Sequence, residues 1–198
     1  MLTQLFPWPI YIHHYDGEKW ATMKEKIKEF INRHPVSESK YQPYSNYGLI
    51  RNDSDRVADS TKLVNELFND SLTEFGSSIG AVGIDITLGW TQTSLKNQEQ
   101  IIHNHENIGF SATCYVEYDP DEHTPTVFYE PLPSFWDGNK KNVEIPGCKE
   151  GTVIFFPAYA DHFTRPNESD KPRVIMAFNF TATPHESVRL QLNEKTIL

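Results

Sequence analysis

The period of the hydrophobic pattern changes near residue 80, and this change limits the folds open to the chain. Before residue 80, apolar residues recur every three or four positions, as they do on one face of a helix. After residue 80, short segments alternate apolar and polar residues, as half-buried strands do. Two helices followed by many short strands predict a mainly β fold with flanking helices, in which a helical cover lies on a β-sandwich or jelly roll.

A length of 198 residues is most simply one domain. We expect its helical cover at about residues 16–80 and its jelly-roll core at about residues 81–198. Pro35 stops the first helix, whose apolar face is formed by Trp20, Met23, Ile27, Phe30 and Ile31. Asp59 or Ser60 is the expected cap of the second helix, and Gly80 marks its end. The apolar face of this second helix consists of Leu63, Val64, Leu67, Phe68, Leu72 and Phe75.

Strands are expected on both sides of these helices. Residues 5–12 read as an edge strand, because prolines within a strand are tolerated at an edge. Alternation continues near the C-terminus, at Val188, Leu190 and Leu192. The other expected strands lie at residues 84–90, 110–118, 126–129, 152–156 and 173–181.

Composition excludes several classes of function. The formal net charge of −9 argues against the broad basic surface that nucleic-acid binding needs. The sequence opens without a secretory signal, and its apolar runs are shorter than the roughly 20 residues of a membrane span. We therefore expect a cytoplasmic protein with no nucleic-acid or membrane partner. Cys114 lies in an apolar segment and is expected in the core, and neither it nor Cys148 needs a catalytic role.

Three histidines have the spacing of a metal site. His103 and His105 are two positions apart, and in an extended segment such residues point to the same face. His162 follows 57 residues after His105, behind the segment Phe156-Pro157. Three ligands on one face leave coordination positions open for substrates. We assign none of the other five histidines to the metal.

Arg173 follows His162 by eleven residues and opens the apolar segment 174–176. A guanidinium group binds a carboxylate through two parallel hydrogen bonds, and a buried arginine is costly unless an anion meets it. This predicts an acidic ligand at Arg173. Two other interpretations are a salt bridge to a core aspartate or glutamate, and a surface arginine that starts a strand after Lys171-Pro172.

These motifs resemble the Fe(II)- and 2-oxoglutarate-dependent oxygenases, and more narrowly a bacterial and phage branch that carries the motif H-x-H. The resemblance covers residues of about 84 to 181. Along it lie the Trp90 strand, the histidine pair, the strand Ser111–Tyr115, the segment Phe128–Pro131, the run from Gly151 through Phe156-Pro157 to His162, and the strand from Arg173 to Asn179. The resemblance implies a double-stranded β-helix, the cupin-like form of jelly roll.

The ligand set departs from the usual pattern of this family, in which the second residue of the pair is a carboxylate. Three alternatives follow. The site is a triad of His103, His105 and His162; or Glu106 supplies the carboxylate; or only two protein ligands bind and an anion fills the gap. We favour the three histidines, which would leave the site one charge unit more positive.

The resemblance also implies the cofactors and the remaining site residues. Fe(II) would sit on the three histidines, 2-oxoglutarate would chelate it, and dioxygen would take the last position. Arg173 would bind the far carboxylate of 2-oxoglutarate, with Tyr115 as a hydrogen-bond partner and Asn179 as a further pocket residue. The expected outcome is hydroxylation of a substrate, with release of succinate and CO2.

Two other functions stay open: a cupin-like three-histidine dioxygenase that does not use 2-oxoglutarate, and a jelly-roll binding module without catalysis. The substrate, a small molecule or a peptide, would be selected by loops at residues 36–58 and 132–147. Aromatic residues in these loops could stack on a ring, cover a peptide or mediate a homodimer; they are Tyr41, Tyr44, Tyr47, Phe135 and Trp136.

Overall fold

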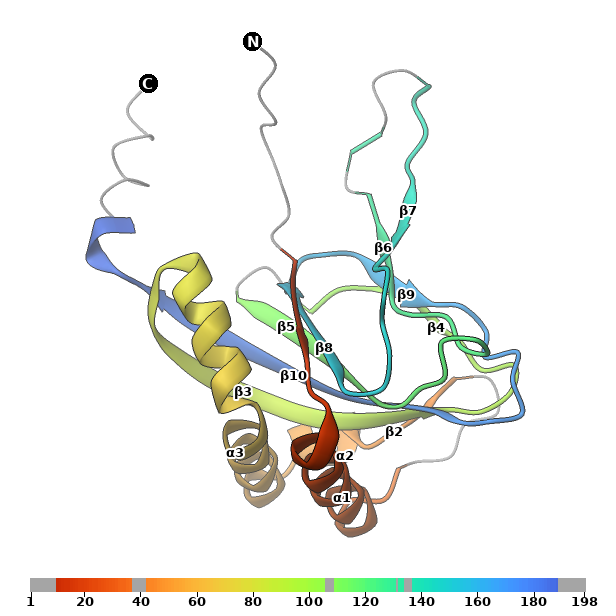
Figure 1. Cartoon of the computed structure of the whole chain (residues 1–198), viewed down its shortest axis with the longest axis horizontal. Coiled ribbons are helices and arrows are strands. Elements are labelled where there is room, and N and C mark those ends of the chain that lie inside the picture. Colours follow the sequence, from red (N-terminus) through yellow and green to blue (C-terminus); the bar gives the residue numbers. More distant parts are fainter. Residues whose placement is uncertain (1–9, 37–41, 106–108, 131, 134–136, 189–198) are drawn as a thin grey trace.

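Two antiparallel sheets face each other in the computed structural model, which describes residues 10–36, 42–105, 109–130, 132–133 and 137–188 (Figure 1). The larger sheet has the order β1-β8-β5-β10-β3-β2, with bounds Tyr11–His14, Thr152–Pro157, Phe110–Glu117, Arg173–Pro184, Ala81–Ser94 and Tyr44–Ser45. The smaller sheet has the order β4-β9-β6-β7, with bounds Gln100–His103, His162–Thr164, Val127–Tyr129 and Asn142–Glu144. This arrangement of two sheets is the predicted jelly roll.

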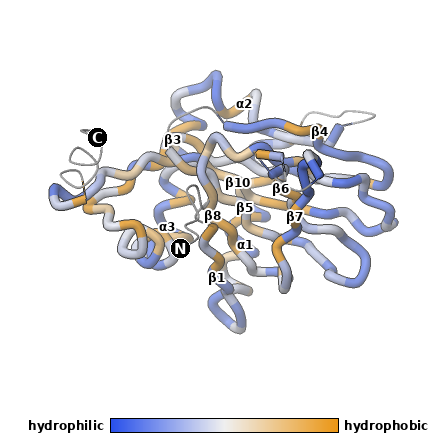
Figure 2. The backbone as a smooth tube through the Cα atoms, turned by 90° about the horizontal axis from the view of Figure 1, so that it is seen from above, coloured by the Kyte–Doolittle hydropathy of each residue, from blue (hydrophilic) through white to orange (hydrophobic). Residues whose placement is uncertain are grey.

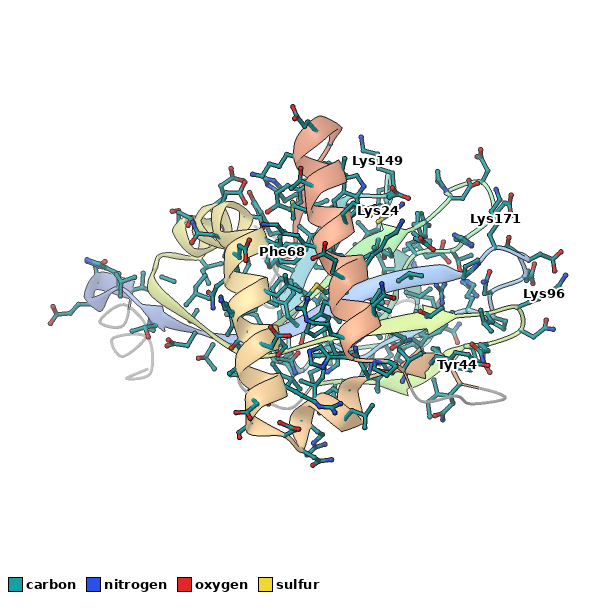
Figure 3. The ribbon with its side chains drawn as sticks, turned by 90° about the horizontal axis from the view of Figure 1, so that it is seen from below. Lys24, Tyr44, Phe68, Lys96, Lys149 and Lys171 are labelled. Carbon is teal, nitrogen blue, oxygen red and sulfur yellow. The ribbon has the colours of Figure 1, made fainter. Side chains whose placement is uncertain are left out.

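Three helices accompany the larger sheet: α1 at Gly17–Arg33, α2 at Tyr47–Arg51 and α3 at Ser54–Ile79. Figure 3 shows α1 and α3 lying next to each other across the strands of this sheet. Ion pairs from Lys19 to Asp70 and from Lys26 to Glu66 connect the two helices on their outer side. The helices thus form the cover that the sequence predicts, although α2 was not expected.

The start of α3 differs from the prediction. Asp53 caps it, because its side chain accepts hydrogen bonds from the backbone N–H groups of Asp55 and Arg56. The expected caps have other partners: Asp59 contacts the ring of His34, and the hydroxyl of Ser60 accepts a hydrogen bond from the backbone of β3. The periodic apolar face begins later than the helix, because its first turn is exposed.

Strand β10 is buried on both faces. Its even residues from Val174 to Phe180 pack in the core that the helices share with the sheet, where Phe178 lies 4.9 Å from the ring of Phe68 on α3. Its odd residues from Arg173 to Asn179 point to the opposite face, toward the smaller sheet. Figure 2 shows this distribution as apolar segments around α3, β5, β8 and β10, with hydrophilic loops at the periphery.

Most of the predicted strands are confirmed to within a few residues, and the short elements are the exceptions. The expected strand at residues 5–12 is the edge strand Tyr11–His14, and residues 5–9 lie outside the described part. Val188 lies in a helical turn and not in a strand, while Leu190 and Leu192 are outside the described residues. The elements that were not expected are β2, α2, β4, β7 and β9.

Cys114 is buried in the core as predicted, and Cys148 is buried as well; both are free thiols. Within the described residues, none of the helices combines the length and the apolar character that a membrane crossing demands.

Gly151 fixes the entry to β8. Its φ of +82° lies in the left-handed region, and an added Cβ would stand 2.3 Å from the carbonyl oxygen of Tyr15 and 3.1 Å from the ring of Trp20. The backbone here is tied on both sides, since Gly151 N–H donates to Tyr115 and its carbonyl accepts from Tyr15. The glycine of the Gly-to-Phe-Pro motif is therefore required by close packing as well as by its φ angle.

We expect Gly151→Ala to lower the free energy of unfolding by about 2 kcal/mol or more, because strain and a backbone clash add together. Gly147→Ala is the matched control: its φ is +75°, yet nothing lies within 4 Å of the added Cβ. This control should cost only about 1 kcal/mol. Urea denaturation of both variants measures the difference, and equal losses would contradict the packing argument.

Candidate metal centre

The three predicted histidines come together between the two sheets. His103 ends β4 and His162 begins β9, and the two residues are directly opposite each other in the pairing of these strands. His105 follows β4, and its backbone N–H donates to the carbonyl of Ala158 at 2.7 Å. One ring nitrogen from each histidine lies within 4.8 Å of the others. The structure therefore gathers the residues of the three-histidine alternative, whereas Glu106 lies outside the described residues.

Backbone carbonyls set the proton positions on two of the rings. Nδ1 of His103 lies 2.8 Å from the carbonyl oxygen of Ile101, and Nδ1 of His162 lies 2.8 Å from that of Ala160. Because a carbonyl only accepts hydrogen bonds, each Nδ1 must carry the proton. Nε2 of both rings is then left without a proton, which is the form that binds a metal.

Burial keeps all three imidazoles neutral. It lowers the pKa of His103, lowers that of His105 to about 4, and lowers that of His162 to about 3. The neighbouring imidazoles act in the same direction on His105 and His162, since each protonated ring would repel the next. Three neutral nitrogen donors at neutral pH fit a divalent transition metal, which competes with protons for the same lone pairs.

The triad lines a cavity of about 410 Å³ that opens between the sheets. Its inner wall is the concave face of the larger sheet, where paired residues of adjacent strands point the same way. Ile175 is paired with Gln92 on β3, and Ala177 is paired with Trp90 on β3 and with Thr113 on β5. All five of these side chains line the cavity.

Arg173 lies on the same face of β10, at the start of the strand. Only 3% of its surface is exposed, and its guanidinium donates to the carbonyl of Thr124 at 2.9 Å and to Oγ of Ser94 at 3.4 Å. Its burial contradicts the interpretation as a surface arginine. No carboxylate among the described residues pairs with it, which contradicts the interpretation as a core salt bridge. Burial lowers the pKa of Arg173, as expected for a cation that lacks an anion.

A second polar group beside Arg173 also lacks a partner. Oγ1 of Thr124 is buried and has no hydrogen-bond partner in the described part of the protein. Buried hydroxyl groups without a partner are uncommon in native proteins. A bound carboxylate would accept hydrogen bonds from both the guanidinium and the hydroxyl.

Tyr115 is close enough to Arg173 to act on the pKa of its guanidinium. It is fully buried on β5, and its hydroxyl accepts a hydrogen bond from the backbone of Thr126 at 2.8 Å and contacts the Thr126 side chain at 3.2 Å. Burial raises the pKa of Tyr115, so the phenol keeps its proton. Thr126 lines the cavity, which places Tyr115 directly behind the wall of the cavity.

Asn179 lies farther along β10 than Arg173. It is six residues from Arg173 on the same strand, which corresponds to about 20 Å. Oδ1 of Asn179 accepts a hydrogen bond from Ser111 at 2.6 Å, and the residue lines a second cavity of about 420 Å³, which His105 of the triad also lines. Asn179 and Arg173 therefore cannot hold the same carboxylate.

One of the two loops expected at the mouth is present there. Residues 42–48 contribute Tyr47 and four neighbours to the cavity lining, whereas Tyr44 is not part of it. No described residue of 132–147 lines the cavity, and Tyr41, Phe135 and Trp136 lie outside the described residues. The polar residues that sequence reasoning missed are Gln42, Ser45, Gln92, Gln100, Asn104, Thr113, Thr126 and Thr164.

The alternation of β3 could have indicated one of these residues. Gln92 continues the series Leu88 and Trp90 at a spacing of two, so it had to share their face. The other polar residues come from short segments that only the tertiary fold brings together.

Residues 89–179 match the model of the protein family described as "Putative 2OG-Fe(II) oxygenase", and this segment carries the triad and Arg173. No curated protein sequence matches the chain. Among solved structures, one similar fold is the non-heme alpha-ketoglutarate-dependent carbocyclase SnoK from nogalamycin biosynthesis. Its TM-score is 0.65 at 11% identity, over 88% of this chain and 79% of that chain.

Two further similar structures contain a metal ion and 2-oxoglutarate. The epimerase SnoN, in complex with Fe3+, alpha-ketoglutarate and nogalamycin RO, has a TM-score of 0.54 at 13% identity, over 87% of this chain and 78% of that chain. HygX from Streptomyces hygroscopicus, with nickel, 2-oxoglutarate and hygromycin B bound, has a TM-score of 0.53 at 11% identity, over 87% of this chain and 82% of that chain. At these identities the structures establish the fold. The family match covers the segment that carries the candidate metal centre, and the similar folds extend over most of the chain.

Proposed function

We propose that this protein is a 2OG-Fe(II) oxygenase and acts as a hydroxylase, which couples the decarboxylation of 2-oxoglutarate to the oxidation of a C–H bond in a small-molecule or peptide substrate. One observation carries the proposal. Three neutral histidines converge in a cavity on the same face of the larger sheet as a buried arginine that has no carboxylate partner among the described residues.

His103, His105 and His162 would hold Fe(II), the first and last through Nε2. The carbonyl groups behind His103 and His162 keep these two rings in one orientation, so that little rearrangement accompanies metal binding. When bound, Fe(II) and 2-oxoglutarate supply the activation of dioxygen, with succinate and CO2 as co-products. The protein contributes binding, orientation and the exclusion of water.

Arg173 would bind the far carboxylate of 2-oxoglutarate by charge-assisted hydrogen bonds. The hydroxyl of Thr124 would donate a further hydrogen bond, which satisfies its unpaired buried oxygen. Tyr115 supports this position through Thr126. Ile175 and Ala177 line the wall between Arg173 and the triad along β10, where their apolar surface limits access of water.

A second candidate function rests on His105. A third imidazole in place of a carboxylate is also compatible with a cupin-like dioxygenase that does not use 2-oxoglutarate. In such an enzyme, Arg173 would bind an acidic group of the substrate. The two functions differ in whether 2-oxoglutarate binds to the iron.

Addition of Fe(II) and 2-oxoglutarate without oxygen should produce a weak visible charge-transfer band. We expect Arg173→Ala to raise the 2-oxoglutarate concentration for half-saturation by at least about tenfold, because it removes a charge-assisted hydrogen-bond pair. Arg173→Lys should be affected less, since it keeps the charge. Arg165→Ala is the control, because Arg165 is exposed and pairs with Glu144.

Absence of the band at saturating 2-oxoglutarate, in a protein that still binds Fe(II), would contradict the proposed function and favour the second candidate. Circular dichroism checks that each arginine variant is folded.

The ligand set is tested with Co(II), which should raise the melting temperature because it binds only the native site. We expect His162→Ala and His105→Ala each to weaken Co(II) binding by at least about 100-fold, since even partners behind metal ligands contribute 10–100-fold. Glu106→Ala and the exposed-site control His185→Ala should bind Co(II) normally. Loss of binding in Glu106→Ala, with His105→Ala unaffected, would replace His105 by Glu106 in the ligand set.

A further inference from the structure

The second cavity, of about 420 Å³, adjoins the triad at His105. The side chains of His105 and Tyr47 line both this cavity and the cavity between the sheets, so they stand between the two. On β10, Ala177 lines the cavity between the sheets and is placed between Arg173 and Asn179, at the two ends of one face. The two cavities therefore approach the triad from different sides.

The proposed function assigns the cavity between the sheets to 2-oxoglutarate. From Arg173 toward the triad, the wall of that cavity is formed by successive pairs of β10 and β3 residues, which are Ile175 with Gln92 and Ala177 with Trp90. A co-substrate that extends from Arg173 to the metal lies along this wall. A second substrate then needs another approach to the metal, and the second cavity provides one at His105.

An irregularity in the larger sheet borders the second cavity. The register of β3 and β10 shifts between Asn179 and Phe180, which leaves Thr87 as an extra residue of β3. Such β-bulges are frequent next to active sites, where they redirect side chains. The hydroxyl of Thr87 donates to the carbonyl of Asn179 at 3.0 Å, and both residues line the cavity. The bulge is thus held in place at the wall of the cavity.

Apolar side chains form much of the described lining of this cavity. Four of them are half-buried and also pack against the core; they are Tyr47, Val57, Leu88 and Phe110. Covering such surface with an apolar ligand is favourable by about 25 cal/mol per Å². A volume of about 420 Å³ lies in the range of small-molecule sites. The lining therefore suits a small molecule with an apolar body.

Arg51 is the charged residue among the described residues that line the second cavity. It ends α2, and its guanidinium lies 5.4 Å from the ring centre of Tyr47. The guanidinium donates to the Tyr47 hydroxyl at 3.4 Å, and no carboxylate pairs with it in the described part of the chain. A guanidinium has five N–H donors, so most of them are left for a ligand. Tyr47 thus holds a cation at the cavity without neutralising it.

Packed aromatic rings connect Arg51 to the triad. The ring of Tyr47 makes an edge contact with Trp90 at 5.1 Å between ring centres, and the ring of Trp90 is 5.4 Å from that of His105. Trp90 is buried in the core. The cation and the metal centre are therefore fixed relative to each other, as recognition of one end of a substrate and oxidation of another require.

A carboxylate fits this cation better than a phosphate does. One guanidinium balances one negative charge, whereas a phosphate monoester carries about −1.5 to −2 and would remain in excess. Asn179 adds a donor to the same cavity, since its Oδ1 is engaged by Ser111 and its amide N–H groups are left for a ligand. Both polar groups therefore donate hydrogen bonds, and an ionised carboxylate only accepts them.

We propose that the second cavity is the substrate site and that the substrate is a small carboxylic acid with an apolar body. Arg51 binds the carboxylate and is the specificity-determining residue. The apolar lining holds the body, and the carbon to be oxidised faces His105. The proposal rests on the proposed function, because it assigns the substrate class of the same metal centre.

The test uses protein loaded with Zn(II), which is redox-inert, and saturating 2-oxoglutarate, with saturation-transfer NMR as the measure of binding. The probes are octanoate, indole-3-acetate and 3-phenylpropanoate. The amide, the amine and the phosphate ester with the same phenylpropyl body are the neutral, cationic and dianionic counterparts. We expect 3-phenylpropanoate to bind at least about fivefold more tightly than these three, as one partly exposed charge-assisted pair provides.

Exchange of Zn(II) for Co(II) locates the bound acid. A paramagnetic ion broadens and shifts the NMR signals of nearby protons. We expect this effect on all three acids, and it should be strongest at the end of the molecule that is remote from the carboxylate. Absence of any effect would place the acids away from the metal centre and overturn the proposal.

Arg51→Gln should weaken binding of the acids by about fivefold and leave binding of the amide unchanged, while Arg51→Lys should lose less. Arg56→Gln is the matched control, because it removes the same charge from a residue that pairs with Asp53 and lines neither cavity. Asn179→Asp keeps the acceptor for Ser111 and should weaken the acids by repulsion. Equal losses in Arg51→Gln and Arg56→Gln, tighter binding of the amine or the phosphate, or no binding of any acid would overturn the proposal.

The charge-transfer band separates this proposal from the proposed function. Arg51→Gln should leave the half-saturation concentration of 2-oxoglutarate unchanged, and its increase in this variant but not in Arg173→Ala would assign Arg51 to 2-oxoglutarate and overturn the substrate site. A normal band without acid binding would reject the substrate class and leave the proposed function intact. Acid binding that depends on Arg51, in a protein without the band, would retain the acid site and reject the use of 2-oxoglutarate.

Discussion

The two-sided burial of β10 is the constraint on which the rest of the structure depends. Its even residues hold α1 and α3 on the sheet, and its odd residues form one wall of the cavity. Because side chains alternate strictly along a strand, a slip of one residue would expose Phe178 to the cavity and bury Arg173 among the helices. The register that fills the aromatic core is therefore the same register that places Arg173 on the face of β10 that forms the cavity wall.

The metal centre depends on a second pairing, which is much shorter. His103 and His162 are opposite each other on β4 and β9, while His105 is fixed after the strand by its bond to Ala158. Each of these segments is too short to be stable alone. They are held by the larger sheet beside them, where the segment from Gly151 to Pro157 leads directly to His162. The segment from Gly151 to His162 thus links the larger sheet directly to the candidate metal centre.

Sequence reasoning succeeded where a periodic segment was long enough to be read by itself. It predicted the apolar faces of α1 and α3. It also predicted the strands between β3 and β10 that have four or more apolar positions. It failed for β2, β7 and β9, whose two or three residues are strands only because a neighbour pairs with them. It could not tell that Asn179, six residues from Arg173, lines a different cavity from the one between the sheets, because that depends on how the strands pack. Gln92 and Gln100 belong to no motif in the sequence. Only the approach of β4 to β3 brings their side chains into contact.

In the proposed ligand set, His105 takes the place of the usual carboxylate, and this changes the charge of the whole site. Fe(II) has two positive charges and 2-oxoglutarate two negative ones, so three neutral imidazoles and Arg173 would leave one positive charge in excess. Asp161 lies beside the mouth, where it bonds to Asn104 and acts on the pKa of His103 in the direction expected for a nearby anion. In the proposed site, this carboxylate would supply the negative charge that the ligand set lacks. A metal centre balanced in this way would need no charge from its substrate.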